Sequence, residues 1–426
     1  MLLLLGLACR PVTLPQDTAP VEEEDLSDAV YDLGKLLRVE VELDPQDWDA
    51  LRSQTRTFES TIGREDCQEQ PFENPFTWFT AAVTLDGQEF PKVEVRKKGF
   101  LGSMSFDKPA LKVDLGEFSE ERFYGVRRLT LNNSVSDPSF VRQCLSYAAF
   151  ADAGLPAPRC SLAHVTVNGQ ELGIYVNLEP LKGPMLERHF EHGDGNLYEG
   201  TLSDFREGWT GTLEKKNNEA EDDWSDIDAL VAAVDVEDEE LVDSLRRVID
   251  LEQFVDFWAL EVLVQHTDGY ASNTNNFYLY ADPSDGRFDF IPWGTDGVLY
   301  GEDGSGSVVY ANGVLANRLY NTDEGRELYL DSLQGLLKSS WKPKRAEQRV
   351  ATMAALIEPE LSGEQWAEVS EQQEWVLDIL RERRERIEDV LDSGAPEWPW
   401  EPRESFCFVE YGAVDATFST TWGSLQ

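Results

Sequence analysis

Positive charge is scarce in this chain. Its 426 residues include 37 Lys and Arg against 81 Asp and Glu, which gives a formal net charge of −44. Such an acidic surface repels nucleic-acid phosphates, so the composition disfavours a nucleic-acid-binding protein and suits a basic protein partner. The hydrophobic content of 41%, with twelve Trp, is typical of a folded globular protein with a sizeable core.

Cysteine and histidine are also scarce. No C-x-x-C pair occurs among the five Cys, and only four His are present, so the sequence lacks the ligand patterns of zinc sites. His189 and His192 have no third ligand beside them and are expected to be a surface pair. We expect Cys144, in an apolar helical pattern, to be a buried thiol. Cys67 and Cys407 lie in loop-like segments and could pair in an oxidising compartment, which the sequence leaves open.

No apolar run is long enough to span a bilayer. The first residues, M-L-L-L-L-G-L-A-C, resemble the end of a bacterial lipoprotein signal, in which the cysteine receives lipid after cleavage. We therefore expect a signal remnant over residues 1–9, lipid at Cys9, an acidic flexible tether over 10–34 and an extracytoplasmic, envelope-anchored location. A plain secretory or misassigned start is the alternative, because Gly6 and the missing basic segment depart from that pattern.

What the sequence does contain is a β-rich half followed by a helical half. An alternating segment at 37–43 and the turns Asp86-Gly87 and Asn168-Gly169 predict strands and hairpins over about 35–200. Helical patterns are found at 137–153, 181–190, 226–234, 238–249, 251–264, 344–358 and 363–393. The predicted class is α+β, with one domain over 35–395, whose helical part covers about 226–395, and a Trp- and Pro-containing tail over 396–426.

Acidic and amide residues cluster around one predicted hairpin in the helical half. Two aromatic-rich arms, 277–280 and 287–291, flank an Asp-Gly turn. Because antiparallel arms return to their starting point, Asn276 before the first arm is expected to lie beside Asp296 after the second. Asp268 precedes both and follows an apolar helix.

This arrangement contains the minimum parts for phosphoryl transfer. We predict that Asp268 is the catalytic residue that orients or deprotonates an acceptor hydroxyl, and that Asn276 and Asp296 bind Mg²⁺ or Mn²⁺. Asn273 is a competing ligand, because its offset of five from Asp268 matches the catalytic loop of kinases. The plain alternative is that these Asp and Asn residues only cap turns.

A second cluster combines glycine with positive charge. The segment R-K-K-G-F-L-G-S-M-S-F-D-K-P-A-L-K-V predicts a loop with Gly99, Gly102 and Ser103, followed by a strand with Lys108 and Lys112 on one face. Loop N–H groups and a lysine can cradle phosphates. No G-K-[ST] opens a helix, so this is not a Walker A motif. An ordinary hairpin would also contain Gly and Lys, but five basic residues within 96–112 are notable in so acidic a chain.

Taken together, these segments resemble the CotH kinase family. The similar segments occur in a fixed order between about 37 and 395: R-K-K-G-F-L-G-S, L-T-L-N-N-S-V-S-D-P-S-F-V-R, G-I-Y-V-N-L-E, G-N-L-Y-E-G, N-N-F-Y-L-Y and F-I-P-W-G-T-D-G. The resemblance implies an atypical protein-kinase-like fold. It also implies transfer of phosphate from ATP, with Mg²⁺ or Mn²⁺, to Ser or Thr of surface or secreted proteins.

The resemblance also assigns roles. Asp268 matches the family's catalytic acid, and Asp296 matches the second acid of a P-W-D-x-D pattern whose first acid is replaced by Gly294. Glu179 is expected to pair with Lys108 or Lys112, as the Lys–Glu pair of kinases does. Because Gly294 removes one family acid, a catalytically inactive surface protein that uses the fold as an acidic binding module is the alternative function.

Overall fold

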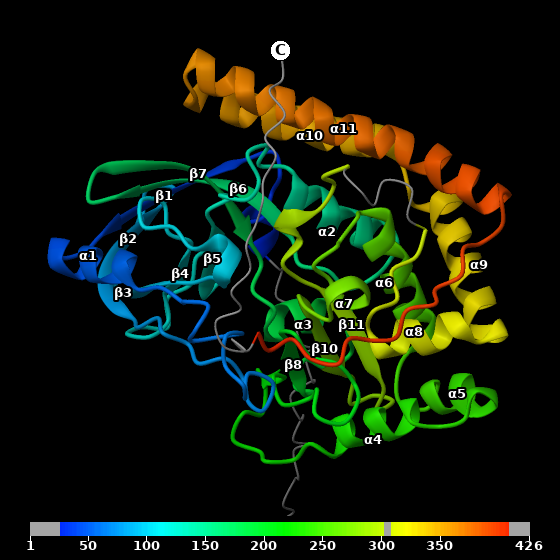
Figure 1. Ribbon diagram of the computed structural model, residues 1–426. Coiled ribbons are helices and arrows are strands. Elements are labelled where there is room, and N and C mark those ends of the chain that lie inside the picture. Colours follow the sequence, from blue (N-terminus) through cyan, green and yellow to red (C-terminus); the bar gives the residue numbers. More distant parts are fainter. Residues whose placement is uncertain (1–25, 302–307, 409–426) are drawn as a thin grey trace, which may run out of the picture.

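The computed structural model describes residues 26–301 and 308–408, and it places a β-barrel beside a helical part (Figure 1). The barrel is closed by parallel pairing of its first strand with β6, in the order β1-β2-β3-β4-β5-β7-β6. Alternate residues of each strand point into its apolar interior. Its strands are β1 (Leu36–Glu42), β2 (Phe79–Leu85), β3 (Gln88–Lys97), β4 (Leu111–Asp114), β5 (Arg128–Asn132), β6 (Cys160–Val167) and β7 (Gln170–Leu178).

The helical part is built on a second, four-stranded sheet. Its order is β11-β10-β8-β9, with β8 (Leu197–Gly200), β9 (Glu214–Lys215), β10 (Phe277–Ala281) and β11 (Phe288–Pro292). Helix α6 (Leu251–Leu263) is buried along most of its length and contributes Trp258, which stacks on Tyr329 with ring centroids 3.9 Å apart. The surrounding helices are α4 (Ser225–Val234), α5 (Asp238–Leu245), α7 (Tyr270–Asn273), α8 (Val314–Asn321) and α9 (Asp323–Ser339).

Two long antiparallel helices, α10 (Pro343–Ile357) and α11 (Gly363–Asp392), lie across both parts (Figure 1). Glu360, just before α11, forms an ion pair of 2.6 Å with Arg38 of the barrel. Arg383 of α11 donates to the carbonyl of Val262 at the end of α6, at 2.6 Å. The helix pair therefore joins the barrel to the helical part. The remaining helices are α1 (Pro45–Ser53), α2 (Arg142–Asp152) and α3 (Gly183–His189), with 3₁₀ turns at Leu26–Ala29, Leu101–Ser103, Thr295–Gly297 and Glu358–Glu360.

The α+β class is confirmed, with strands concentrated before residue 200 and helices after it. The hairpin of β10 and β11 also forms, with Phe277 opposite Pro292. Helices α8 and α9 were not predicted. The tether was predicted to extend to residue 34, which is wrong at its end, because Val30 and Tyr31 are buried in the barrel core. Among the described residues no helix is long and apolar enough to cross a membrane, and Cys9 lies outside the described residues.

Both cysteine pairs are disulfides. Cys67 bonds to Cys407, 340 residues away, and Cys144 bonds to Cys160. The prediction of a buried thiol at Cys144 is therefore wrong, because α2 packs against β6 and brings the two Cα atoms within 5.1 Å. The Cys67–Cys407 bond joins residues 54–78, here the cysteine loop, to residues 396–408, here the C-terminal strap.

The C-terminal strap runs along the helical part (Figure 1). Its backbone accepts hydrogen bonds from Tyr320 of α8 at Pro396 and from Asn317 at Trp400. Phe406 is buried against Trp209, with ring centroids 4.9 Å apart. The strap therefore connects the helical part to the cysteine loop, which belongs to the barrel side of the molecule.

Candidate active site

The segment between α6 and β10 is organised by a buried carboxylate. Glu261 accepts hydrogen bonds from the backbone N–H groups of Tyr270 and Ala271, each at 2.8 Å. Its carboxylate also lies 3.5 Å from His266 Nδ1, and this contact raises the pKa of His266 against the opposite effect of burial. A Cβ on Gly269 would overlap Glu261 Oε1, so only glycine fits there. These contacts set the conformation of the loop that carries Asp268.

The Asp268 carboxylate is held by three side-chain amides. Its Oδ1 accepts from Asn273 at 2.6 Å and from Asn275 at 3.1 Å, and its Oδ2 accepts from Asn276 at 2.7 Å. The side chain is nevertheless exposed at the mouth of a cleft. A carboxylate that is fixed in orientation, reachable from solvent and without a bonded cation is suited to receive a proton from a bound hydroxyl.

The hairpin brings Asn276 and Asp296 to the same cleft, as the sequence predicted. Trp293 N donates to Asn276 O at 3.2 Å, which joins the two ends of the hairpin. Asn276 Nδ2 donates to Asp268 Oδ2, which directs the other end of the amide, Asn276 Oδ1, toward Gly294. Asp296 is half-buried in the turn Thr295–Gly297, and burial raises its pKa.

The predicted alternative ligand, Asn273, is not available for a metal in this structure. Its Nδ2 donates to Asp268, and its Oδ1 accepts from Arg403 Nη1 of the C-terminal strap at 2.8 Å. Both ends of the amide are therefore occupied. Asn273 and Asn275 act as positioning groups for Asp268, and sequence reasoning overlooked the role of Asn275.

The oxygen donors that remain fit a divalent cation only in part. Among the described residues no group of three or more His, Cys, Asp or Glu could hold a metal ion. Asp296 offers carboxylate oxygens, and Asn276 offers an amide oxygen. Mg²⁺ is commonly bound by one or two carboxylates together with waters and substrate phosphates. The site therefore fits a cation that arrives with a phosphate ligand rather than a resident structural ion.

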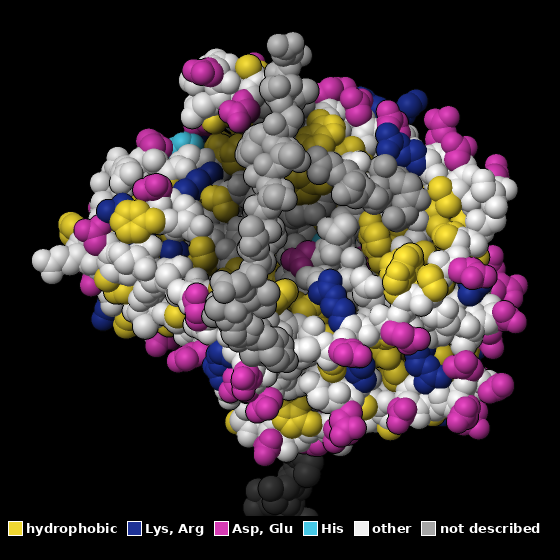
Figure 2. Space-filling view, viewed as in Figure 1, with side chains coloured by type: hydrophobic (Ala, Val, Ile, Leu, Met, Phe, Trp, Pro, Cys, Tyr) yellow, Lys and Arg dark blue, Asp and Glu magenta, His cyan; other side chains and the backbone are white. Residues whose placement is uncertain are grey.

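The cleft between the barrel and the helical part has a volume of about 430 Å³ and a lining in which basic side chains slightly outnumber acidic ones. Acidic side chains dominate the rim of the molecule (Figure 2). The acidic residues of the cleft lining are Glu199, Glu214, Asp268 and Asp296, and its basic residues are Arg56, Arg96, Lys98, Lys112 and Lys216. Burial, together with the charge of neighbouring Arg96, lowers the pKa of Lys98 to about 8 and that of Lys112 to about 7. These side chains are poised to bind an anion, which would restore their charge.

The glycine loop, residues 98–110, forms one wall of this cleft. Gly99, Gly102 and Ser103 line it, as predicted. Gly99 has φ +130, and a Cβ there would overlap Ser103 Oγ, which requires glycine. Asn133 Nδ2 donates to the carbonyls of Ser103 at 3.0 Å and Lys108 at 2.8 Å, which holds the loop in place.

Two of the predicted phosphate-binding residues lie elsewhere. Lys108 Nζ donates to Ile174 O at 2.7 Å and lies over the rings of Phe140 and Tyr175, so it is structural. Glu179 does not pair with Lys108 or Lys112. Its carboxylate instead binds Arg159, at 2.6 Å, and Arg188, and Glu179 does not line the cleft.

Lys98, and not the predicted Lys108, lines the cleft near Asp296. Its ammonium contacts Asn132 Oδ1, and Asp296 is the carboxylate with the strongest effect on its pKa. Asn132 Nδ2 donates to Gln143 Oε1 of α2 at 3.1 Å, and Gln143 Nε2 lies 3.4 Å from Asp296 Oδ1. The path Lys98–Asn132–Gln143–Asp296 therefore joins the barrel and α2 to the turn Thr295–Gly297. The adjacent Gly99 was the sequence signal that could have identified Lys98.

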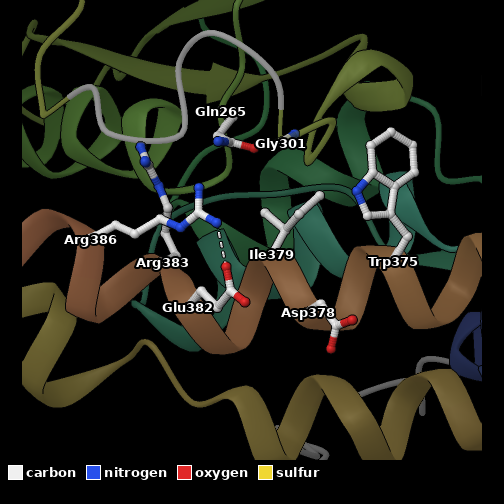
Figure 3. A pocket seen from close by; sticks show the side chains of 8 residues that line it. All are labelled: Gln265, Gly301, Trp375, Asp378, Ile379, Glu382, Arg383 and Arg386. Atoms are coloured by element: carbon white, nitrogen blue, oxygen red, sulfur yellow. Dashed lines mark hydrogen bonds and ion pairs between the residues drawn. The ribbon is translucent and has the colours of Figure 1, made fainter.

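A smaller cavity of about 180 Å³ lies under α11 and is separate from the cleft (Figure 3). Trp375, Ile379 and Arg383 of α11 line it on one side, and Gln265 and Gly301 on the other. It contains none of the predicted site residues.

We expect Gly294→Ala to lower the free energy of unfolding by about 1–2 kcal/mol, the cost of a left-handed non-glycine residue, plus the cost of a clash. Gly294 has φ +56, and a Cβ there would overlap Asn276 Oδ1. Chemical denaturation would measure the change. Gly286→Ala is the matched control, because Gly286 has φ +74 in the same hairpin with no atom near its Cβ position. Equal losses in the two variants would contradict the clash.

The chain is similar in sequence to a family of known proteins. The family model described as CotH kinase protein matches residues 95–387, more than half of the chain. The inner spore coat protein H of Bacillus subtilis (strain 168) is 25% identical over 260 residues, covering 57% of this chain and 71% of that protein. The inner spore coat protein H-like protein of the same organism is 26% identical, covering 53% and 66%. Invasin CotH2 of Rhizopus delemar is 25% identical, covering 36% of this chain and 29% of the invasin.

Two solved structures align with a large part of the chain. The Helicobacter pylori proinflammatory kinase CtkA aligns with a TM-score of 0.35 and 13% identity, covering 70% of this chain and 93% of that one. HipA of a Shewanella oneidensis MR-1 toxin–antitoxin complex aligns with a TM-score of 0.35 and 12% identity, covering 63% and 61%. Similarity at this level carries no argument, so the assignment depends on the family model and the order of the motifs along the chain. On that basis the chain belongs to the CotH kinase protein family.

Proposed function

We propose that this protein is a protein kinase that transfers the γ-phosphate of ATP, with Mg²⁺ or Mn²⁺, to Ser or Thr of surface or secreted proteins. The observation that carries the proposal is the convergence of Asp268, Asn276 and Asp296 on one cleft that is also lined by lysine and arginine side chains. Phosphoryl transfer depends mainly on positioning and on the neutralisation of charge, and these are the groups that it requires.

Each group has a separate role in this proposal. Asp268 would orient the acceptor hydroxyl and receive its proton. Asn276 Oδ1 and Asp296 would hold the divalent cation, which when bound neutralises charge on the phosphate oxygens. Lys98, from the barrel side, would pair with the same phosphates, and the backbone N–H groups of the glycine loop would cover them.

A catalytically inactive binding module is the second candidate. The observation that favours it is Gly294, which stands where the resemblance places an acid and leaves no room for a side chain. A shift of the thermal midpoint with ATP and Mn²⁺ would support nucleotide binding. Transfer of radiolabel from ATP to a Ser-containing basic peptide would support the kinase, and stable nucleotide binding without transfer to any peptide would favour the inactive module.

We also infer an extracytoplasmic location, with lipid at Cys9. Two disulfides in one chain favour an oxidising compartment, since thiols stay reduced in the cytosol. Labelling of thiols with a maleimide before cell lysis should leave Cys67, Cys144, Cys160 and Cys407 unlabelled. Metabolic labelling with palmitate should mark the wild type and not Cys9→Ala. Four reactive thiols in the isolated protein would contradict the location.

Anion binding should weaken as the pH rises from 7 to 9. In the empty cleft, Lys112 and Lys98 lose their protons near pH 7 and pH 8, whereas an anion favours the charged forms, so binding must take up protons in this range. Calorimetry with magnesium tripolyphosphate in two buffers of different ionisation enthalpy would measure the uptake. Lys112→Met should reduce it. Affinity that is constant from pH 7 to 9, without a buffer effect, would contradict this expectation.

A further inference from the structure

The cysteine loop, residues 54–78, brings an arginine into the cleft from outside the family-matched segment. That segment begins at residue 95. The Arg56 guanidinium lies 5.8 Å from the ring centroid of Phe76 and 5.2 Å from that of Phe100. Phe72 packs edge-on against Phe100, with ring centroids 5.3 Å apart. Aromatic rings therefore hold Arg56 at the cleft wall, where Phe72, Phe76 and Phe100 also line the cavity.

Arg56 and its neighbour Arg96 have buried donors without acceptors. Arg56 Nε and Nη1 and Arg96 Nε are buried and have no hydrogen-bond partner among residues 26–301 and 308–408. Buried guanidinium donors are normally satisfied, because an unsatisfied polar group costs free energy. Since both residues line the 430 Å³ cleft, a ligand in the cleft can supply the missing acceptors.

The nearby carboxylates do not supply them. Glu199 and Glu214 both pair with Lys216, at 2.9 Å and 2.7 Å. Within the described part of the chain, no ion pair within 4 Å joins Arg56, Arg96 or Lys112 to a carboxylate. Lys98, by contrast, has Asp296 as its strongest acidic neighbour. This end of the cleft therefore has excess positive charge, in a protein of net charge −44.

Three of these cations are neighbours on the barrel wall of the cleft. Arg96 and Lys112 are register partners on β3 and β4, so their Cα atoms are about 4.5–5.5 Å apart. Lys98 follows Arg96 by two residues on the same face, about 6.6–6.8 Å along the strand direction. Arginine binds phosphate with two parallel N–H donors. Several neighbouring cations suit linked phosphates better than a single carboxylate.

We propose that Arg56, Arg96 and Lys112 form an anion subsite for the polyphosphate chain of the nucleotide donor. The subsite rests on the proposed kinase function and extends it, because Lys98 and Asp296 hold the end of the chain at which transfer takes place. The cysteine loop contributes Arg56 to the cleft lining. The Cys67–Cys407 bond attaches this loop to the C-terminal strap.

The test is the binding of magnesium tripolyphosphate to the whole oxidised chain, measured by calorimetry. Loss of one charge-assisted pair corresponds to about a tenfold change in affinity, so Arg56→Gln should bind at least tenfold more weakly. The tripolyphosphate affinity of Arg56→Lys should lie between that of Arg56→Gln and that of the wild type. Arg64→Gln is the matched control, because Arg64 lies in the same loop and pairs with Asp66 at the surface. It should stay within twofold of the wild type.

Unchanged tripolyphosphate affinity in Arg56→Gln would overturn the subsite. The subsite would also be overturned if Arg56→Gln only raised the KM for an acidic or phosphorylated acceptor peptide. Because Arg56 packs against aromatic rings, thermal midpoints without ligand are compared first, and Arg96→Gln serves if Arg56→Gln does not fold. The measurement is repeated in Asp268→Ala, in which slowed transfer should leave the Arg56 dependence of binding unchanged. Arg56-dependent binding in a wild-type chain that transfers phosphate to no acceptor would contradict the kinase and keep the subsite.

Discussion

Asp268→Ala is expected to lower kcat for phosphoryl transfer by about 10²–10⁴-fold, the usual contribution of a positioned general acid or base, with little change in the affinity for magnesium ATP. The carboxylate is fixed by Asn273, Asn275 and Asn276 and is exposed at the cleft mouth. Its removal eliminates the group that would receive the hydroxyl proton but leaves the basic side chains of the cleft lining intact. Initial rates with radiolabelled ATP and separate binding measurements would distinguish the two effects.

The matched control is Asp282→Ala, which removes an acid at the opposite end of the same hairpin. The Asp282 carboxylate accepts from Ser284 N at 2.8 Å and does not line the cleft, so kcat should be close to that of the wild type. Asp296→Ala should instead abolish the metal dependence of ATP binding, because Asp296 is the carboxylate assigned to the cation. Transfer that survives in Asp268→Ala at the wild-type rate would remove Asp268 from the catalytic role.

Removal of the Cys67–Cys407 disulfide is expected to lower the free energy of unfolding by about 2–5 kcal/mol. The bond closes a loop with a sequence separation of 340 residues, and in the chain-entropy model a longer loop gives a larger stabilisation. The double variant Cys67→Ala with Cys407→Ala would be compared with the wild type by chemical denaturation. The same variant should also bind tripolyphosphate more weakly, since the loop that carries Arg56 loses its attachment to the strap.

Cys144→Ala with Cys160→Ala is the control for this comparison. That bond has a sequence separation of only 16, so the chain-entropy model gives about 3 kcal/mol and no effect on the cleft is expected. If removal of Cys67–Cys407 costs less than removal of Cys144–Cys160, the strap contributes little to stability. If tripolyphosphate affinity is unchanged, the strap does not position Arg56.

The sequence correctly predicted the part of the site that depends on local structure. The Asp285-Gly286 turn and the aromatic arms define a hairpin, and a hairpin necessarily brings the residues before and after it together. The proximity of Asn276 and Asp296 therefore follows from the order of residues. The glycine loop was also predicted from local sequence, and Gly99 adopts φ +130, a conformation that other residues avoid.

Choices among similar residues could not be made in the same way. Lys98, Lys108 and Lys112 are close in sequence, but only the structure shows that Lys108 turns to Ile174 O and that Lys98 faces Asp296. Glu179 matched a kinase pattern by its position in the sequence, but in the structure it forms ion pairs with Arg159 and Arg188. Asn273 and Asn276 differ because the C-terminal strap contributes Arg403 to one of them.

By itself, the sequence determined the α+β class and the hairpin that brings Asn276 and Asp296 together, because turn chemistry and side-chain periodicity act over a few neighbouring residues. The order of motifs along the chain indicated the family. Only the tertiary structure decided the cysteine pairs, the choice of Lys98 and the entry of Arg56 into the cleft. Each of these depends on contacts between segments that are distant along the chain, and such contacts are set by how the barrel, the helical part and the strap pack together.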